Sequence, residues 1–115
     1  MLKPSELKDI ERYLKNLKHS SVSHPYTKTL NVYTVAGEPF AYLETGKATL
    51  RLSLRSDPGL AKLLRERYEE VAPGQRLDPR KWNTIVISGQ LGVDELKALI
   101  DHSYALAADK ASPSK

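Results

Sequence analysis

The sequence predicts an α+β fold, in which helices pack on one face of an antiparallel sheet of four or more strands. Apolar residues follow the 3.6-residue period of a helix near both ends of the 115-residue chain and once in its middle. They alternate with polar residues, with the period of a strand, over residues 47–55. Alternating strands bury one side and can leave the other in water, so helices are expected on a single face. We expect one domain, residues 1–108, followed by a disordered tail, residues 109–115.

The first expected element is an amphipathic helix over residues 4–18. Pro4 suits its first turn, and its apolar residues recur at helical spacing. These residues are Leu7, Ile10, Leu14 and Leu17. Residues 20–25, with the sequence Ser-Ser-Val-Ser-His-Pro, break the period and are expected to form a loop.

Three strands are predicted next, over residues 28–36, 39–45 and 47–55. Short connections that contain Gly37 and Gly46 join them, which is typical of antiparallel neighbours. The third strand alternates without a break, whereas the first alternates less cleanly. The sequence therefore does not decide which side of the first strand faces the core. It is either the side of Leu30 and Val32 or the side of Tyr33 and Val35.

The period of the sequence changes to that of a helix after Asp57. This aspartate can cap a helix whose first turn holds Pro58 and whose apolar residues continue to about residue 70. A loop, a buried strand and a closing helix are expected over residues 72–81, 82–89 and about 93–108.

Composition limits the class of protein. The chain is 40% hydrophobic and 28% charged, as in an ordinary folded domain. It contains no cysteine, which excludes disulfides, thiol nucleophiles and thiolate metal sites. The N-terminal segment is charged, and no apolar run approaches the roughly 20 residues that span a bilayer. We expect a cytoplasmic protein with no membrane partner, and a monomer rather than an oligomer.

No constellation of residues predicts catalysis. The three histidines, His19, His24 and His102, have no metal-ligand spacing to one another or to paired acids. Asp101, His102 and Ser103 carry the side chains of a hydrolase triad, but adjacent residues of a helix diverge by about 100° and cannot converge on one proton. The sequence also lacks a glycine-rich phosphate loop. We therefore expect no enzyme, no metal and no cofactor.

Basic residues are the feature of the sequence that indicates a function. On the polar side of strand 47–55, Lys47, Arg51 and Arg55 recur every four residues, so neighbouring members lie roughly 13 Å apart in an extended strand. That length covers several phosphates of one nucleic-acid strand. A second basic cluster, Arg76, Arg80 and Lys81, lies in the loop before Trp82. If this loop packs beside the exposed side of the sheet, six cations form one surface.

Other interpretations of these residues stay open. Exposed strands commonly carry Lys and Arg for solubility and to prevent edge pairing. Trp82 adjoins an apolar strand, so a core position is favoured over a base-stacking platform. The sheet face could also dock a protein partner or a small acidic ligand. An unrecognised enzyme would need a pocket with two convergent titratable groups.

The chain resembles the MmcQ/YjbR family along nearly its whole length. The motifs are Gly37 with Pro39-Phe40-Ala41, the Asp57-Pro58 turn, Pro73-Gly74, Leu77-Asp78, the run from Arg80 to Thr84, and Asp94-Glu95-Leu96 with the Ser103-Tyr104 pair. Five of these residues are taken as the structural motif. They are Phe40, Trp82, Asn83, Ser103 and Tyr104.

The resemblance implies a CyaY-like fold and a DNA-binding function. Two departures matter, since Glu38 stands where the family usually has lysine, and Gln75-Arg76 replaces its usual Tyr-His. Frataxins share this architecture and bind iron through an acidic first helix, but the first helix of this chain is rich in lysine and arginine. The leading hypothesis is a non-enzymatic domain that binds DNA weakly and without sequence preference through Lys47, Arg51, Arg55, Arg76, Arg80 and Lys81. The alternative is a protein-interaction or small-ligand module with no nucleic-acid role.

Overall fold

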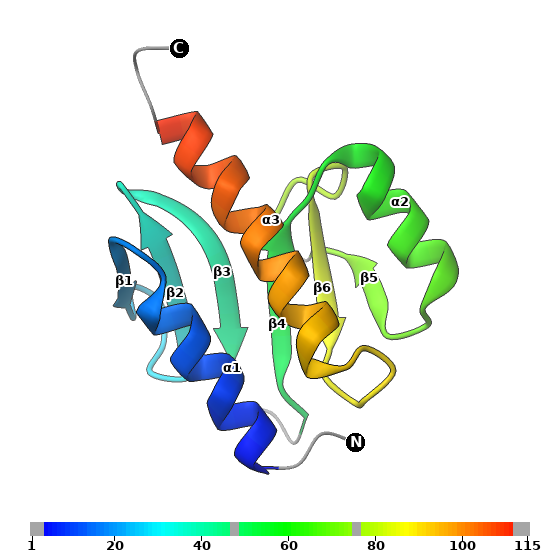
Figure 1. Cartoon of the computed structure of the whole chain (residues 1–115), viewed down its shortest axis with the longest axis horizontal. Helices are drawn as coiled ribbons and strands as arrows, with labels where there is room; N and C mark the ends of the chain where they lie inside the picture. Colours follow the sequence, from blue (N-terminus) through cyan, green and yellow to red (C-terminus); the bar gives the residue numbers. More distant parts are fainter. Residues whose placement is uncertain (1–3, 47–48, 75–76, 112–115) are drawn as a thin grey trace.

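The computed structural model describes residues 4–46, 49–74 and 77–111, and it confirms the α+β fold class (Figure 1). A six-stranded antiparallel sheet has the order β1-β2-β3-β4-β6-β5. The strands are β1 (Ser20–Ser23), β2 (Leu30–Val35), β3 (Glu38–Glu44), β4 (Arg51–Arg55), β5 (Val71–Pro73) and β6 (Trp82–Val86). The helices are α1 (Pro4–Asn16), α2 (Pro58–Arg67) and α3 (Val93–Ala111).

The three helices pack on the same face of the sheet, as the sequence predicted. In Figure 1, α1 and α3 cross the sheet on one side, and α2 lies near β5 and β6. The apolar side of each strand and the apolar stripe of each helix are buried between these layers. The largest fully buried side chains of this core are Phe40, Ile10, Leu14, Leu43, Leu52, Ile85, Leu96 and Ile100.

The opposite side of the sheet is called the open face, because none of the three described helices covers it. Residues that pair across antiparallel strands point to the same side, so the pairing register identifies its members. The members on β3, β4 and β6 are Tyr42, Glu44, Arg51, Ser53, Arg55, Trp82, Thr84 and Val86. The predicted outward direction of the polar side of β4 is therefore confirmed.

The two outermost strands, β1 and β5, were expected to be loops, and that prediction is wrong. β1 is a run of serines around Val22, and β5 is three residues long and ends at Pro73. Edge strands are solvated along one border and need no alternating apolar pattern, so neither segment shows the period of a strand. Conversely, β4 begins at Arg51 rather than at residue 47. Lys47 and Arg76 lie outside the described residues.

The C-terminal helix is longer than the sequence pattern indicated. α3 continues through Asp109 and Lys110 to Ala111, three residues past its expected end. Lys110 contributes to this extension because its ammonium lies 3.4 Å from the Glu38 carboxylate and near the negative end of the helix. The expected boundary at residue 108 therefore falls inside a helix, and residues 112–115 are not described.

The hairpin between β2 and β3 turns on two residues with positive φ. Ala36 has φ 51° and Gly37 has φ 83°, which is the pattern of a type I′ turn. Left-handed backbone costs an L-residue roughly 1–2 kcal/mol, whereas glycine adopts it freely. The turn thus stores a small strain at Ala36.

Ala36→Gly is expected to raise the free energy of unfolding by about 0.5–1 kcal/mol, after the larger chain entropy of unfolded glycine is subtracted. Denaturant unfolding at constant slope measures the change. Ala72→Gly is the matched control, since Ala72 is an exposed residue of the extended strand β5. That substitution should lower stability, and a gain of similar size at both positions would contradict the argument.

No described helix is long and apolar enough to cross a membrane.

Candidate nucleic-acid interface

Arg51 is the most accessible of the predicted phosphate-binding residues on β4. It starts the strand on the open face, where it pairs with Glu44 of β3 and Val86 of β6. The carboxylate of Glu44 accepts hydrogen bonds from the Thr29 hydroxyl at 2.9 Å and from the Gly46 amide at 3.4 Å. Glu44 is thus engaged with the loop beside it, and Arg51 is exposed to solvent.

Arg55 also points to the open face, but its side chain is only 13% exposed. Its Nε donates to the Pro39 carbonyl at 2.7 Å, and its Cζ lies 4.9 Å from the centre of the Trp82 ring. One of its terminal nitrogens lies 3.8 Å from the Glu38 carboxylate. Carboxylates therefore neighbour both cations, because Glu44 lies opposite Arg51 and the β2–β3 hairpin brings Glu38 beside Arg55 at the end of β4.

A second ion pair forms in the turn before β6. The Arg80 side chain, 81% exposed, donates to the Asp78 carboxylate, with Nε 3.3 Å from Oδ1. Hydrogen bonds from the Arg80 side chain and backbone lower the pKa of Asp78, and the charge of Lys81 acts in the same direction. An exposed pair of this kind is weak, so Arg80 can exchange its carboxylate for a phosphate. Lys81 is exposed at the end of the same turn.

Trp82 lies on the open face rather than in the core between sheet and helices. Trp82 is nevertheless only 6% exposed, because Tyr42 and Arg55 pack against its ring and Gly74 lies close to its Cβ. A Cβ at Gly74 would lie 2.8 Å from the Trp82 Cβ, so the loop approaches this closely only with glycine. The predicted core position of Trp82 is therefore correct in that the residue is buried, and wrong in that its side chain lies on the open face.

Tyr42 extends the aromatic surface from Trp82 across β4. The two rings meet at an angle of 64° with their centres 5.4 Å apart. Burial raises the pKa of the Tyr42 phenol, the Tyr26 phenol raises it further, and Arg55 opposes both. Tyr26 lies in the loop between β1 and β2, and it is 70% exposed.

Four residues of the predicted structural motif hold the elements together below this surface. The buried Asn83 amide donates to the Ala61 carbonyl at 3.1 Å, and its oxygen accepts from Arg65 at 2.8 Å. These bonds attach α2 to β6. The remaining residues of this group are Phe40, Ser103 and Tyr104.

Ser103 joins α3 to two strands. Its hydroxyl donates to the Phe40 carbonyl at 2.5 Å and accepts the Arg55 amide N–H at 2.8 Å. The Tyr104 ring contacts Phe40 edge-on at 5.4 Å, and its hydroxyl donates to the Lys18 carbonyl. These residues have a structural role that places β3 and β4 under α3.

The apparent triad does not assemble. Asp101 accepts from the Tyr13 hydroxyl at 2.6 Å, His102 accepts the Asp57 amide N–H at 3.1 Å, and Ser103 binds the strands. The three side chains leave the helix toward three different elements, as the sequence argument required. Among the described residues, no group of three or more His, Asp or Glu is arranged to hold a metal ion.

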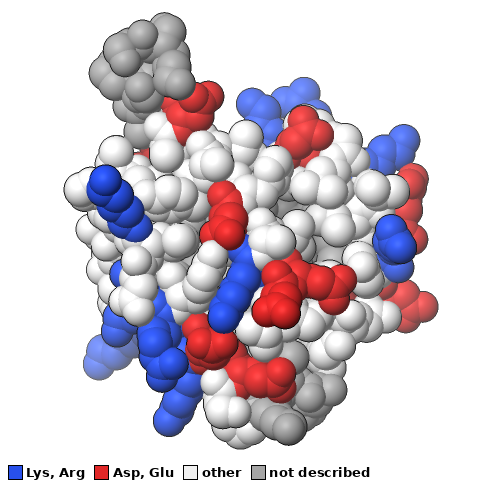
Figure 2. Space-filling model, viewed as in Figure 1, with Lys and Arg blue, Asp and Glu red and all other residues white. Residues whose placement is uncertain are grey.

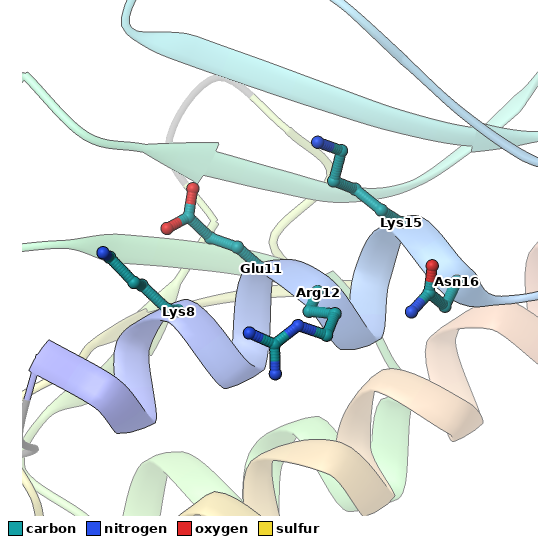
Figure 3. A pocket seen from close by; sticks show the side chains of 5 residues that line it. All are labelled: Lys8, Glu11, Arg12, Lys15 and Asn16. Atoms are coloured by element: carbon teal, nitrogen blue, oxygen red, sulfur yellow. The ribbon is translucent and has the colours of Figure 1, made fainter.

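A second cationic surface lies on the helix side of the molecule. Figure 2 shows Lys and Arg side chains gathered around α1, at the lower left. An open hollow of about 360 Å³ lies along the solvent-facing side of this helix (Figure 3). It is lined by Lys8, Glu11, Arg12, Lys15 and Asn16. All five residues belong to one helix, and Glu11 places a carboxylate among the cations.

Sequence reasoning missed the contributions of Glu38, Tyr26 and Tyr42 to the open face of the sheet. The facing of Tyr42 follows from alternation within the strand over residues 39–45, once the inward side of that strand is known. No local pattern indicates that Glu38 reaches Arg55 or that the loop with Tyr26 bonds to Glu44 through Thr29. Those contacts depend on the hairpin and on the β1–β2 loop.

Comparison with known proteins places the chain in a family. The family model described as YjbR matches residues 15–106. The uncharacterized protein YjbR of Escherichia coli K12 is 31% identical over 70 residues, which cover 61% of this chain and 59% of that protein. The protein of the same name from Escherichia coli O157:H7 matches to the same extent. The matched part of the chain thus spans less than two thirds of the length of these relatives.

Two solved structures share the fold. The Deinococcus radiodurans protein DR2400 has a TM-score of 0.87 and 26% identity, over 94% of this chain and 82% of that chain. A protein from Pseudomonas syringae has a TM-score of 0.74 and 21% identity, over 92% of this chain and 99% of that chain, which indicates likeness of fold alone. The family match covers most of the described domain, including β1 to β6. The chain therefore belongs to the YjbR family.

Proposed function

We propose that this domain binds nucleic acid through phosphate contacts on the open face of the sheet. The observation that carries the proposal is Arg51, an exposed residue at the start of the central strand β4, on a face that no described helix covers. The Glu44 carboxylate opposite it is hydrogen-bonded to Thr29 and Gly46. Arg51 makes no ion pair with another described residue, so it can bind a phosphate oxygen without breaking one.

The other end of β4, about 13 Å from Arg51 in an extended strand, adds positive charge. The Glu38 carboxylate is shared by Arg55 and Lys110, so two cations face one acid at this end of the sheet. Lys81 and Arg80 supply further exposed cations near Asp78. An excess of cations beside an uncovered sheet attracts a polyanion from a distance and keeps it close.

The expected binding is weak and without sequence preference. Phosphate contacts fix position and carry no base information. Arg55 acts chiefly as a fixed positive charge, since its side chain is held by Pro39, Trp82 and Glu38. Arg51, Arg80 and Lys81 are left as the residues that contact phosphates directly.

The test is a titration of the protein with DNA at several salt concentrations. Three phosphate contacts predict that the logarithm of affinity falls with the logarithm of salt concentration at a slope of about −2 to −3. The double variant Arg51→Gln, Lys81→Gln should weaken binding to all sequences alike and reduce the slope by about 1 for each residue. It leaves the ion pairs of Arg55 and Arg80 in place.

The matched control is Lys8→Gln, Lys15→Gln, which removes the same charge from the outer side of α1. It should leave the slope nearly unchanged. A larger loss in this control than in the sheet variant would move the interface to α1. Absence of any salt-dependent binding would refute the proposal and favour a protein-interaction or small-ligand module.

A further inference from the structure

The open face carries aromatic rings as well as cations, and the rings differ in how much of each is exposed to solvent. Trp82 is covered, Tyr42 is half-buried against it, and Tyr26, in the loop between β1 and β2, is 70% exposed. The loop that holds Tyr26 is attached to this side of the sheet by the hydrogen bond from Thr29 to Glu44 at 2.9 Å. The rings therefore form a series whose accessibility rises from β6 toward the β1–β2 loop.

An exposed aromatic ring next to a cationic strand matches one chemical class of polyanion. Unpaired bases stack on aromatic side chains with little dependence on sequence, whereas the faces of paired bases are occupied within a duplex. Arg51 lies diagonally across β3 and β4 from Tyr42, which pairs with Ser53. Diagonal neighbours of this kind are roughly 7–8 Å apart, so a base at the tyrosines and a phosphate at Arg51 can belong to neighbouring nucleotides.

From this arrangement we infer that the ligand of the open face is single-stranded nucleic acid, with bases stacked on Tyr26 and Tyr42 and the backbone on Arg51. The inference rests on the proposed function and adds the form of the nucleic acid to it. Tyr42 and Trp82 support the platform from below, because the Trp82 ring is fixed between Tyr42 and Arg55. Tyr26 provides the accessible stacking surface.

The experiment compares a fluorescently labelled oligothymidine with a duplex of the same length, at one fixed low salt concentration. Fluorescence anisotropy should give a dissociation constant at least about tenfold lower for the single strand. Loss of one base stack predicts that Tyr26→Ala weakens single-strand binding by about five- to a hundredfold and leaves duplex binding unchanged. Tyr26→Phe keeps the ring and should retain the affinity.

Leu63→Ser is the control for removal of an exposed apolar side chain, because Leu63 is an exposed residue of α2 on the helix side. It should change neither affinity. The single tryptophan, Trp82, gives an independent signal, since a base that stacks on Tyr42 alters its fluorescence.

The outcomes separate the two claims. Equal or tighter binding of the duplex, or an unchanged affinity in Tyr26→Ala, overturns the single-strand inference and leaves the proposed function standing. No binding of either oligonucleotide overturns both. Oligouridine in place of oligothymidine then tells whether RNA or DNA is preferred, because only the ribose carries a 2′-hydroxyl.

Discussion

Replacement of Ser103 by alanine is expected to lower the free energy of unfolding by about 2–6 kcal/mol. The Ser103 hydroxyl is fully buried and serves two backbone groups, the Arg55 amide and the Phe40 carbonyl. Alanine leaves both groups without a partner, and each buried unsatisfied polar group costs about 1–3 kcal/mol. Urea or guanidinium unfolding at constant slope measures the loss.

Ser53→Ala is the matched control for this serine. The Ser53 hydroxyl bonds to the Thr84 hydroxyl at 2.8 Å on the half-buried open face, where water can replace either partner. Its loss should cost less than about 1 kcal/mol. Equal losses of unfolding free energy at positions 53 and 103 would contradict the argument that the buried hydrogen bonds of Ser103 stabilise the fold more than the half-buried bond of Ser53.

Phe40→Ala is the second large effect, with an expected loss of about 3–5 kcal/mol. The Phe40 ring is fully buried and contacts Tyr33 at 6.3 Å and Tyr104 at 5.4 Å between ring centres. Removal of the ring opens a cavity where β3 meets α3. Domains of this size have a total stability of about 5–15 kcal/mol, so this substitution removes a large part of it.

Phe40→Leu retains most of the apolar volume and should cost distinctly less than alanine. Leu63→Ala, at an exposed position on α2, should change stability by no more than about 0.5 kcal/mol. Thermal or denaturant unfolding measures the order of the losses in stability. We expect the largest loss for Phe40→Ala, a smaller one for Phe40→Leu and the smallest for Leu63→Ala. A loss at position 63 equal to that at position 40 would contradict the assigned core.

The fold was predictable where each element carries its own period. β4 and the three helices bury one regular side, so alternation or helical spacing indicates them directly, whereas β2 and β3 each bury two adjacent residues and alternate less cleanly. Strands β1 and β5 escaped prediction because they lie at the edges of the sheet. Their stability comes from hydrogen bonds to β2 and β6, which leave no trace in the local sequence.

The sequence predicted which way the side chains of the candidate site point, but it did not predict their ion-pair partners. Alternation along β4 gave the outward facing of Arg51 and Arg55, because side chains on a strand alternate whatever lies nearby. It could not give the partners of Arg55. Glu38 reaches Arg55 through the tight hairpin turn at Ala36-Gly37, and Lys110, at the far end of α3, shares the Glu38 carboxylate.

The sequence by itself determined the α+β class, the side of β4 that faces solvent and the absence of cysteine chemistry, since these follow from residue types and local spacing. Only the tertiary structure decided which cations on the open face are neutralised and which aromatic rings lie beside them. The reason is physical: facing depends on the backbone period of one strand, whereas ion pairs and ring contacts depend on distances between segments that lie far apart in the chain.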